Sequence, residues 1–309
     1  MGCCHSQLEP IRPSLPSFPG SLTSTFSRQR FSSISQSNSP QLFSNNFLYL
    51  FDCKDNKTRL TLYDTVLRDM GQRFIQTPEP LDKYTSTAQL PNSEIFCFGN
   101  HDPSSGFACI IDMKQLKVKK TLPPGAPCNS VAAVYYKNSV YIFGGFDGSK
   151  STTLANRFDL SLNKWNKLAP LPMESFNCSC IEFNECILVS GYYHTKVYKY
   201  DLTQNNYSEL SEAVVDGDNH KILAVANSRA YIVENYGFIL ESDEMNEMVW
   251  RKIGKSTLTS FAQHYWIWND GSLFIGLIHW YASDYFYDFY QFELREKKFE
   301  RIGEYEIKV

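Results

Sequence analysis

The first six residues form the densest group of modifiable positions in the chain: Met1, Gly2, Cys3, Cys4, His5 and Ser6. Glycine at the second position with serine four residues later fits the pattern for myristoylation of Gly2 once Met1 is removed. Cys3 and Cys4 are suited to palmitoylation, which matters because a single myristoyl chain binds a membrane only weakly. We therefore predict a lipid anchor at Gly2, Cys3 and Cys4, which would hold the protein at the cytoplasmic face of a membrane. If these residues are unmodified, a soluble cytoplasmic protein is expected.

A second group of polar and aromatic residues follows a series of glycines. Three of the six histidines fall two or three residues after such a glycine. The members of this group that we select as partner-binding residues are His101, Asp102, Asp147, Tyr193, His194, Lys196, His279 and Trp280. Histidine is the commonest metal ligand, so the three histidines are also weighed as a metal site. Aromatic and mixed charged residues are typical of protein interfaces, and we favour a recognition surface with no metal.

The remaining candidate chemistry is weaker. Cys178 and Cys180 are two residues apart and Cys186 follows a turn, but structural zinc sites favour two such pairs or added histidines. We therefore predict buried thiols. The sequence contains no nucleophile elbow, phosphate-binding loop, zincin helix or kinase motif, so we predict no catalytic residues and no cofactor.

Composition limits the classes of function. Apolar residues make up 43% of the 309 residues and aromatic residues 15%, which favours a strand-rich core. The formal net charge of -3 gives no basic face for nucleic acid. No apolar stretch reaches the roughly 18 residues typical of a membrane span, and the N-terminus has no secretory signal. The cysteines are therefore expected in a reducing compartment, where disulfides are rare.

Residues 1–40 differ from the rest of the chain. They contain eleven serines and five prolines, with apolar residues scattered without a period. Such a segment cannot bury enough surface to offset its chain entropy. We predict a disordered tail over residues 1–40 and one folded domain over residues 41–309.

The folded part contains repeats, of which Ser130 to Pro172 is the clearest. An apolar strand and the turn Lys137-Asn138 lead to a second strand that ends in two glycines. An aromatic-acid pair, a tryptophan and a leucine-proline stretch follow. Four short strands joined by tight turns make one propeller blade. The unit resembles a kelch repeat through Gly144, Gly145, Phe158, Asp159 and Trp165. The resemblance implies a propeller whose loops bind partners.

Two landmarks recur six times at a spacing close to that of kelch repeats, and a third recurs in five of the six repeats. Gly144 aligns with Asp52, Gly99, Gly191, Glu234 and Gly276. The acidic pair recurs as Tyr63-Asp64, Ile111-Asp112, Phe158-Asp159, Tyr200-Asp201, Leu240-Glu241 and Phe292-Glu293. The outer-strand aromatic recurs as Phe74, Trp165, Tyr207, Trp250 and Phe299, with Val118 in the second repeat. We predict an all-β fold, a six-bladed β-propeller of four-stranded kelch-like blades.

Each landmark has an expected role. The glycine permits positive φ or close backbone approach, the aromatic packs between blades, and the acid accepts hydrogen bonds in a turn. Two segments compete as the inner strand of the first blade, Gln41 to Ser44 and Tyr305 to Val309, and we favour the second.

Two functions of different class remain. We favour a non-enzymatic scaffold or adaptor whose loop face binds a protein or peptide partner while the lipid anchor holds it at a membrane. The alternative is a sugar-modifying enzyme, epimerase-like or oxidase-like, that uses the central channel. Converging carboxylates, arginine and histidine in the channel would indicate the enzyme. The identity of the partner and the oligomeric state are not predicted.

Overall fold

The computed structural model describes residues 46–192, 194–210, 220–235, 237–242, 250–258, 263–281 and 284–307. For residues 280, 281, 284, 306 and 307 the structure describes the backbone alone. The predicted tail over residues 1–40, the lipidation positions Gly2, Cys3 and Cys4, and the segment Gln41 to Ser44 all lie outside the described residues. Within the described residues, no helix has the length and apolar character needed to span a membrane.

Strands dominate the described part of the chain and form six antiparallel sheets. The first sheet contains β1 (Phe47–Lys54), β2 (Lys57–Asp64) and β3 (Asp69–Ile75). The second contains β4 (Ser86–Leu90), β5 (Glu94–Phe98), β6 (Ala108–Asp112) and β7 (Lys117–Thr121), with the short helix η1 (Pro91–Ser93) between β4 and β5. The third contains β8 (Ala132–Tyr136), β9 (Ser139–Phe143), β10 (Ala155–Asp159) and β11 (Lys164–Lys167).

The other three sheets follow in chain order. The fourth contains β12 (Ser179–Phe183), β13 (Cys186–Ser190), β14 (Val197–Asp201) and β15 (Asn206–Glu209). The fifth contains β16 (Lys221–Ala226), β17 (Arg229–Glu234), β18 (Phe238–Ser242) and β19 (Trp250–Lys255). The sixth contains β20 (Gln263–Asn269), β21 (Ser272–Tyr281), β22 (Asp284–Glu293) and β23 (Lys298–Ile307).

Tight two-residue turns set the register of the sheets. The turn between β8 and β9 places Lys137 at φ 44° and Asn138 at φ 58°, both in the left-handed region. Two consecutive residues of positive φ are the signature of a type I′ turn, whose twist matches that of the flanking strands. Asn184-Glu185 and Asn227-Ser228 repeat this conformation in the next two sheets. The sheets are therefore built as successive hairpins.

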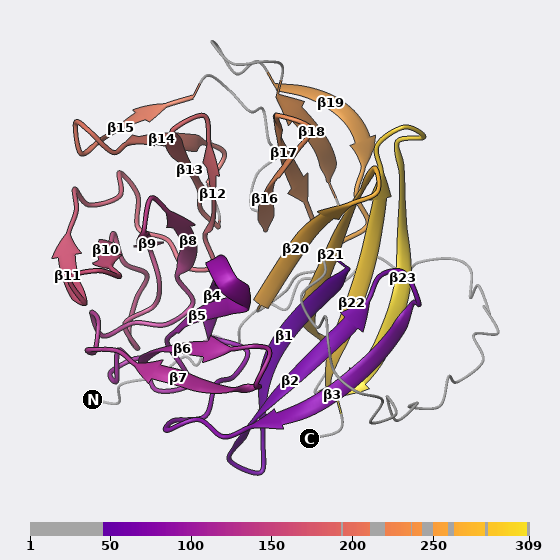
Figure 1. Ribbon diagram of the computed structural model, residues 1–309. Coiled ribbons are helices and arrows are strands. Elements are labelled where there is room, and N and C mark those ends of the chain that lie inside the picture. Colours follow the sequence, from indigo (N-terminus) through magenta and orange to yellow (C-terminus); the bar gives the residue numbers. More distant parts are fainter. Residues whose placement is uncertain are drawn as a thin grey trace, which may run out of the picture. The chain divides into compact units, whose positions relative to one another are not determined.

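The core is divided into six apolar clusters, and each cluster lies between two adjacent sheets. One joins the second and third sheets and includes Phe96 and Phe158. The other five join the third to the fourth, the fourth to the fifth, the fifth to the sixth, the sixth to the first, and the first to the second. Six interfaces among six sheets describe a closed ring, as Figure 1 shows. The predicted all-β, six-bladed propeller is confirmed.

The ring closes between the sixth and first blades. Gln263, at the start of β20, accepts a hydrogen bond from Phe51 N in β1 at 2.9 Å through Oε1. Its Nε2 donates to Thr85 O at 2.7 Å, just before β4. A single amide side chain therefore joins three blades at the closure.

The expected closure by the C-terminal segment is wrong for its described residues. β23 pairs with β22 over its whole length, with Tyr305 opposite Tyr287, so the segment extends the outer strand of the sixth blade. The ring of Tyr305 still reaches the first blade, where its centroid lies 6.5 Å from that of Tyr63. The alternation of residues in this segment correctly predicts a strand, but it does not identify the strand with which the segment pairs.

Candidate functional site at the loop face and central channel

One face of the ring, here called the loop face, carries the loops between second and third strands together with the loops between blades. These loops are joined by backbone hydrogen bonds. Asn129 N donates to Phe146 O at 3.0 Å, and Phe146 N donates back to Asn129 O at 2.9 Å. Gly145 N donates to Ser175 O at 2.8 Å, which links the third blade to the loop before the fourth. Regular backbone pairing holds these loops in fixed positions.

Hydrogen bonds also join the residues that lie two positions before the first residue of each of the inner strands β4, β8 and β12. Ser130 N donates to Tyr84 O at 3.0 Å, and Asn177 N donates to Ser130 O at 2.9 Å. Ser130 adopts φ 52° and Asn177 φ 48°, so both bend the chain in the left-handed region. The same contact therefore joins the second blade to the third and the third blade to the fourth.

Aromatic side chains form a row across the third to fifth blades on this face. The ring centroids of Phe146 and Phe176 are 6.4 Å apart, and those of Phe176 and Tyr192 are 5.4 Å apart. Tyr192 then packs on His220 at 3.9 Å. Phe146, Phe176 and Tyr192 are half-buried, so each keeps part of its ring exposed. Edge-to-face contacts of this kind are favourable and fix ring orientation.

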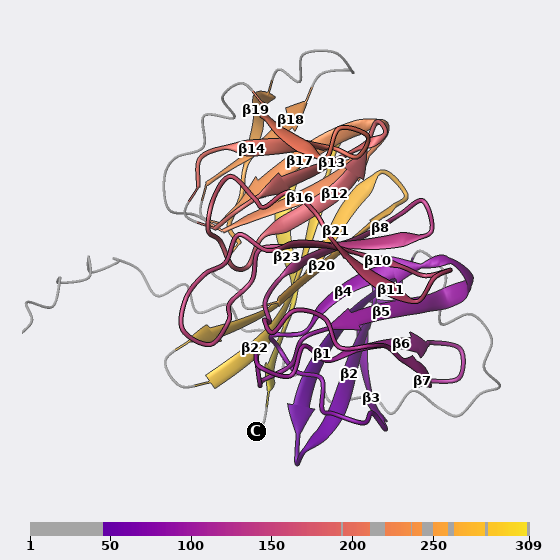
Figure 2. The ribbon, with the colours of Figure 1, turned by 90° about the vertical axis from the view of Figure 1, so that its left-hand side faces the viewer.

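The sixth and first blades rise higher than the others on the loop face. β21 and β22 each have ten residues, whereas β9 and β13 have five (Figure 1, Figure 2). Lys83 Nζ lies 3.6 Å from the ring centroid of Tyr285, close enough for a cation–π contact between the second and sixth blades. The loop face is therefore asymmetric, with a raised side at the sixth blade.

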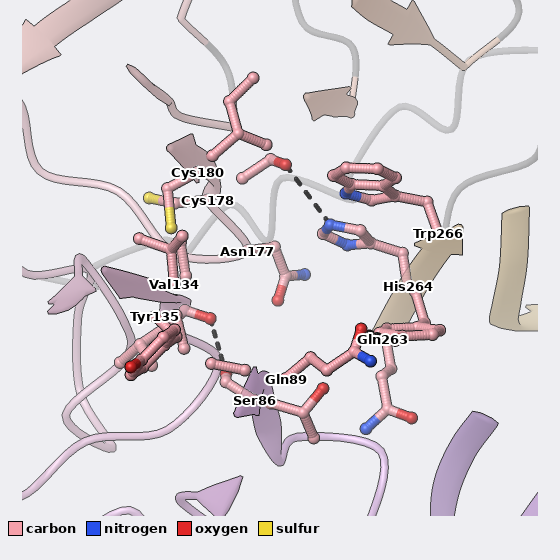
Figure 3. Close-up of a pocket in the computed structure, with 18 of the residues that line it drawn as sticks. Ser86, Gln89, Val134, Tyr135, Asn177, Cys178, Cys180, Gln263, His264 and Trp266 are labelled. Atoms are coloured by element: carbon pink, nitrogen blue, oxygen red, sulfur yellow. Dashed lines mark hydrogen bonds between the residues drawn. The ribbon is translucent and has the colours of Figure 1, made fainter. Parts of the chain in front are cut away.

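A cavity of about 580 Å³ lies between the inner strands, and Figure 3 shows its lining. We call it the channel. Its lining residues come from β4, β8, β12, β16 and β20 and from the residues just before them. Polar members include Gln89, Asn177, Ser179, Gln263 and His264. Aromatic members include Tyr84, Tyr135, Tyr265, Trp266 and Trp268.

His264 is the titratable base inside the channel. Its Nε2 lies 3.4 Å from Ser179 Oγ, and that oxygen accepts Leu223 N at 2.9 Å. Desolvation lowers the pKa of His264 to about 4. The imidazole is therefore neutral at pH 7 and is a weak base for general catalysis.

Comparison with known proteins bears on the family. Residues 127–172 match the family model of the kelch motif. This segment is the third blade with the loop before it, in a chain whose described sheets close a six-bladed ring. The chain is a six-bladed β-propeller with a kelch motif in its third blade.

The solved structure of YjhT is similar to this propeller, with a TM-score of 0.60 at 14% sequence identity. The similarity covers 73% of this chain and 84% of YjhT. At this identity, the likeness concerns the fold alone. No curated protein matches the sequence.

Glycines end the second strands of the central kelch blades. Gly99 has φ 76°, Gly144 φ 66° and Gly145 φ 114°, all in the left-handed region. A Cβ on Gly191 would lie 2.6 Å from Ser175 Oγ, so this glycine permits close approach instead. Gly276 differs, because β21 continues through it to Tyr281. The placement of Gly276 at a strand end is wrong.

The acid that ends the third strand closes the following turn in the first four kelch blades. Asp159 Oδ1 accepts Ser161 N at 3.0 Å and Leu162 N at 2.9 Å. Asp64, Asp112 and Asp201 accept backbone N–H groups in the same way. This arrangement is an Asx-turn. Glu241 has a longer side chain and pairs instead with arginines, Arg229 at 2.9 Å and Arg251 at 2.7 Å.

The outer-strand aromatics pack between kelch blades, with one exception. Trp165 contacts Phe96 and Phe98 of the second blade, and its Nε1 donates to Pro123 O at 2.9 Å. Trp250 packs against the cluster between the fourth and fifth blades. Phe74 is 58% exposed, so the packing role predicted for Phe74 is wrong.

The predicted binding residues of the second and third blades lie in loops. His101 has a side chain that is 89% exposed, and its Nδ1 lies 3.7 Å from Asp82 Oδ2. Asp102 and Asp147 each accept hydrogen bonds within their own loops, from Ser104 and from Ser149 and Lys150. The hydrogen bonds from these groups lower the pKa of both carboxyls.

In the fourth blade, His194 and Lys196 also lie in the loop after the second strand. His194 Nε2 lies 3.0 Å from Glu174 O, and Lys196 Nζ pairs with Glu209 at 2.7 Å. Tyr193 lies outside the described residues, as does the side chain of Trp280.

His279 was expected in a loop, and this placement is wrong. It lies within β21, is 6% exposed and has Nδ1 2.9 Å from Asp288 Oδ2. Asp288 is fully buried and also accepts Arg301 Nε at 2.9 Å. His279 therefore belongs to a buried polar network, and we remove it from the candidate binding residues.

The described cysteines are free thiols. Cys178 and Cys186 are buried and Cys180 is half-buried. Desolvation raises the pKa of Cys178 and of Cys186 to about 11, so both thiols are protonated at pH 7. Among the described His, Cys, Asp and Glu residues, no three are grouped so that they could hold a metal ion.

Sequence reasoning missed the aromatic row and the channel lining. Phe146 and Tyr192 directly follow glycines that end second strands, which is a signal that the sequence carries, whereas Phe176 lies in the loop before the fourth blade and follows no such landmark. The lining of the channel depends on which strand is innermost in each blade, and that requires the ring itself.

Proposed function

We propose that this kelch propeller is a non-enzymatic interaction module, a scaffold or adaptor whose loop face binds a protein or peptide partner. The observation that carries the proposal is the row formed by Phe146, Phe176 and Tyr192. Partly exposed rings on loops held by backbone hydrogen bonds supply anchor residues at low entropic cost, as in binding hot spots. Exposed His101, Asp102, Lys150 and Glu174 add polar groups on the same face.

The test combines Phe176→Ala with Tyr192→Ala and measures partners recovered by proximity labelling. Losing two anchors should lower affinity by about 10-fold or more. Leu162→Ala is the matched control, because Leu162 is 70% exposed on a turn between third and fourth strands, at the opposite face. Equal partner recovery from the double variant and the control, with equal thermal stability, would count against the loop face.

We propose in addition that acylation of Gly2, Cys3 and Cys4 holds the propeller at the inner face of a membrane. The support is the sequence pattern, since two acyl chains give stable anchoring where one does not. A clickable myristate analogue should label the wild type and not Gly2→Ala, and Cys3→Ser with Cys4→Ser should shift the protein toward the soluble fraction. Identical labelling and fractionation of wild type and Gly2→Ala would refute the anchor.

The alternative, a sugar-modifying enzyme in the channel, is not favoured by the lining. Such an enzyme is expected to have several carboxylates, together with arginine and histidine, that converge in the channel. Among the described lining residues, Glu182 is the only carboxylate and His264 the only histidine, and no arginine lies there.

A further inference from the structure

The channel has a distinctive charge composition. Glu182 is exposed and, among the lining residues that the structure describes, is the only side chain charged at neutral pH. No lysine or arginine lines the cavity within that part of the chain. Glu182 makes no ion pair with any described residue. A cleft lined by charge of one sign, with walls of low dielectric, concentrates ions of the opposite sign.

Aromatic side chains supply a second feature of the same lining. Tyr135, Trp266 and Trp268 are half-buried: each packs against an apolar cluster between blades and also lines the cavity. Figure 3 shows Tyr135 and Trp266 on opposite sides of the cavity, with Asn177 between them and His264 beside Trp266. The ring of Tyr265 is already engaged, stacked on Tyr49 at 3.7 Å. The face of an aromatic ring attracts cations, and tryptophan does so most strongly.

We propose that the channel is a binding site for an organic cation, such as a quaternary ammonium group carried by a small molecule or by a methylated lysine side chain. Trp266, Trp268 and Tyr135 would contact the methyl groups, and Glu182 would balance the charge. Asn177 and Gln263 supply amide groups for a polar part of the ligand. The volume, about 580 Å³, lies in the range of small-molecule sites.

The residues that line the channel argue against other classes of ligand. An anion would need a basic partner, and the described lining has none. The histidine does not supply one, because burial keeps His264 neutral at pH 7. A neutral ligand could use the amides but would gain nothing from Glu182.

The test compares choline with its neutral carbon isostere, dimethylbutanol, which has the same shape without the charge. Binding to the full-length protein is measured by saturation-transfer NMR and by quenching of tryptophan fluorescence. We expect choline to bind about 3- to 30-fold more tightly than the isostere, the range that cation–π contacts support. A peptide with one trimethyllysine tests the side-chain source, and acetate tests anions.

Two variants locate the site. Glu182→Gln should lower choline affinity about 3-fold or more, whereas Glu185→Gln should not, because Glu185 is exposed in the neighbouring turn and does not line the channel. Trp266→Leu should remove most of the fluorescence response. Equal affinity for choline and the isostere, preference for acetate, or no response to choline or the trimethyllysine peptide at millimolar concentration would overturn the proposal.

Discussion

The joint between the third and fourth blades can be tested with a pair of glycine substitutions. Gly144 has φ 66°, and a Cβ there would lie 2.5 Å from Ser175 O and 2.6 Å from Cys178 Sγ. Gly271, in the turn between β20 and β21, has φ 77° but no atom within 4 Å of the same position. Gly144→Ala and Gly271→Ala therefore share the backbone strain and differ only in available space.

The magnitudes follow from these contacts. Alanine in the left-handed region costs about 1–2 kcal/mol, and this is the whole expected effect of Gly271→Ala. Gly144→Ala must also displace the Ser175 carbonyl, which accepts Gly145 N at 2.8 Å. Losing that hydrogen bond in a buried setting adds about 1–3 kcal/mol. We expect Gly144→Ala to lower the free energy of unfolding by about 2–5 kcal/mol in total.

Equilibrium urea unfolding, followed by tryptophan fluorescence, measures both variants under the same conditions. Trp165 is a suitable reporter because it lies between the second and third blades. The difference between the losses in unfolding free energy of the two variants gives the steric contribution alone, because both variants carry the same strain from positive φ. If the variants lose equal stability, the loop before β12 yields without cost, and the statement that backbone hydrogen bonds hold it in a fixed position is refuted.

Three further predictions concern single side chains. Asp159→Ala should cost about 1 kcal/mol in urea unfolding, because two backbone N–H groups lose their acceptor; an unchanged midpoint would contradict the Asx-turn. Arg301→Ala should cost about 3 kcal/mol, since the fully buried carboxylate of Asp288 is left without its arginine, and thermal unfolding that matches wild type would exclude this role. His264 is neutral in the fold with its pKa lowered from 6.5 to about 4, so its contribution to stability is present above pH 6.5 and lost as pH falls toward 4. In His264→Asn, the urea midpoint should therefore depend less on pH between pH 4 and 6.5 than it does in the wild type. An equal dependence of the midpoint on pH in the two proteins would argue against a neutral imidazole in the fold.

The repeats were predictable because their signals are local. A glycine at a strand end, an aspartate that closes a turn and a tryptophan on the next strand each act within a few residues. Their recurrence at a constant spacing gives the number of blades. Leu240-Glu241 was aligned correctly with the other pairs, but the different role of Glu241 depends on Arg229 and Arg251, which lie on neighbouring strands.

The errors arose where distant residues decide the outcome. The strand that contains Gly276 and His279 continues alongside β22, where Asp288 pairs with His279 and also with Arg301 of β23. A loop histidine and a buried one look alike in sequence until that partner is known. Gln263 could not be identified as a closing residue, since its partner Phe51 is 212 positions away.

That long separation has a consequence for synthesis. The first blade leaves the ribosome early, but the groups that cover its inner edge, Gln263 and the residues after it, are among the last to be made. At about 5–20 residues per second, translation of the intervening segment takes roughly 10–40 s. During that interval Phe51 N lacks its Gln263 acceptor, and the apolar residues of the first blade lack the contacts that the sixth blade supplies, so the nascent chain exposes apolar surface that favours association with another copy.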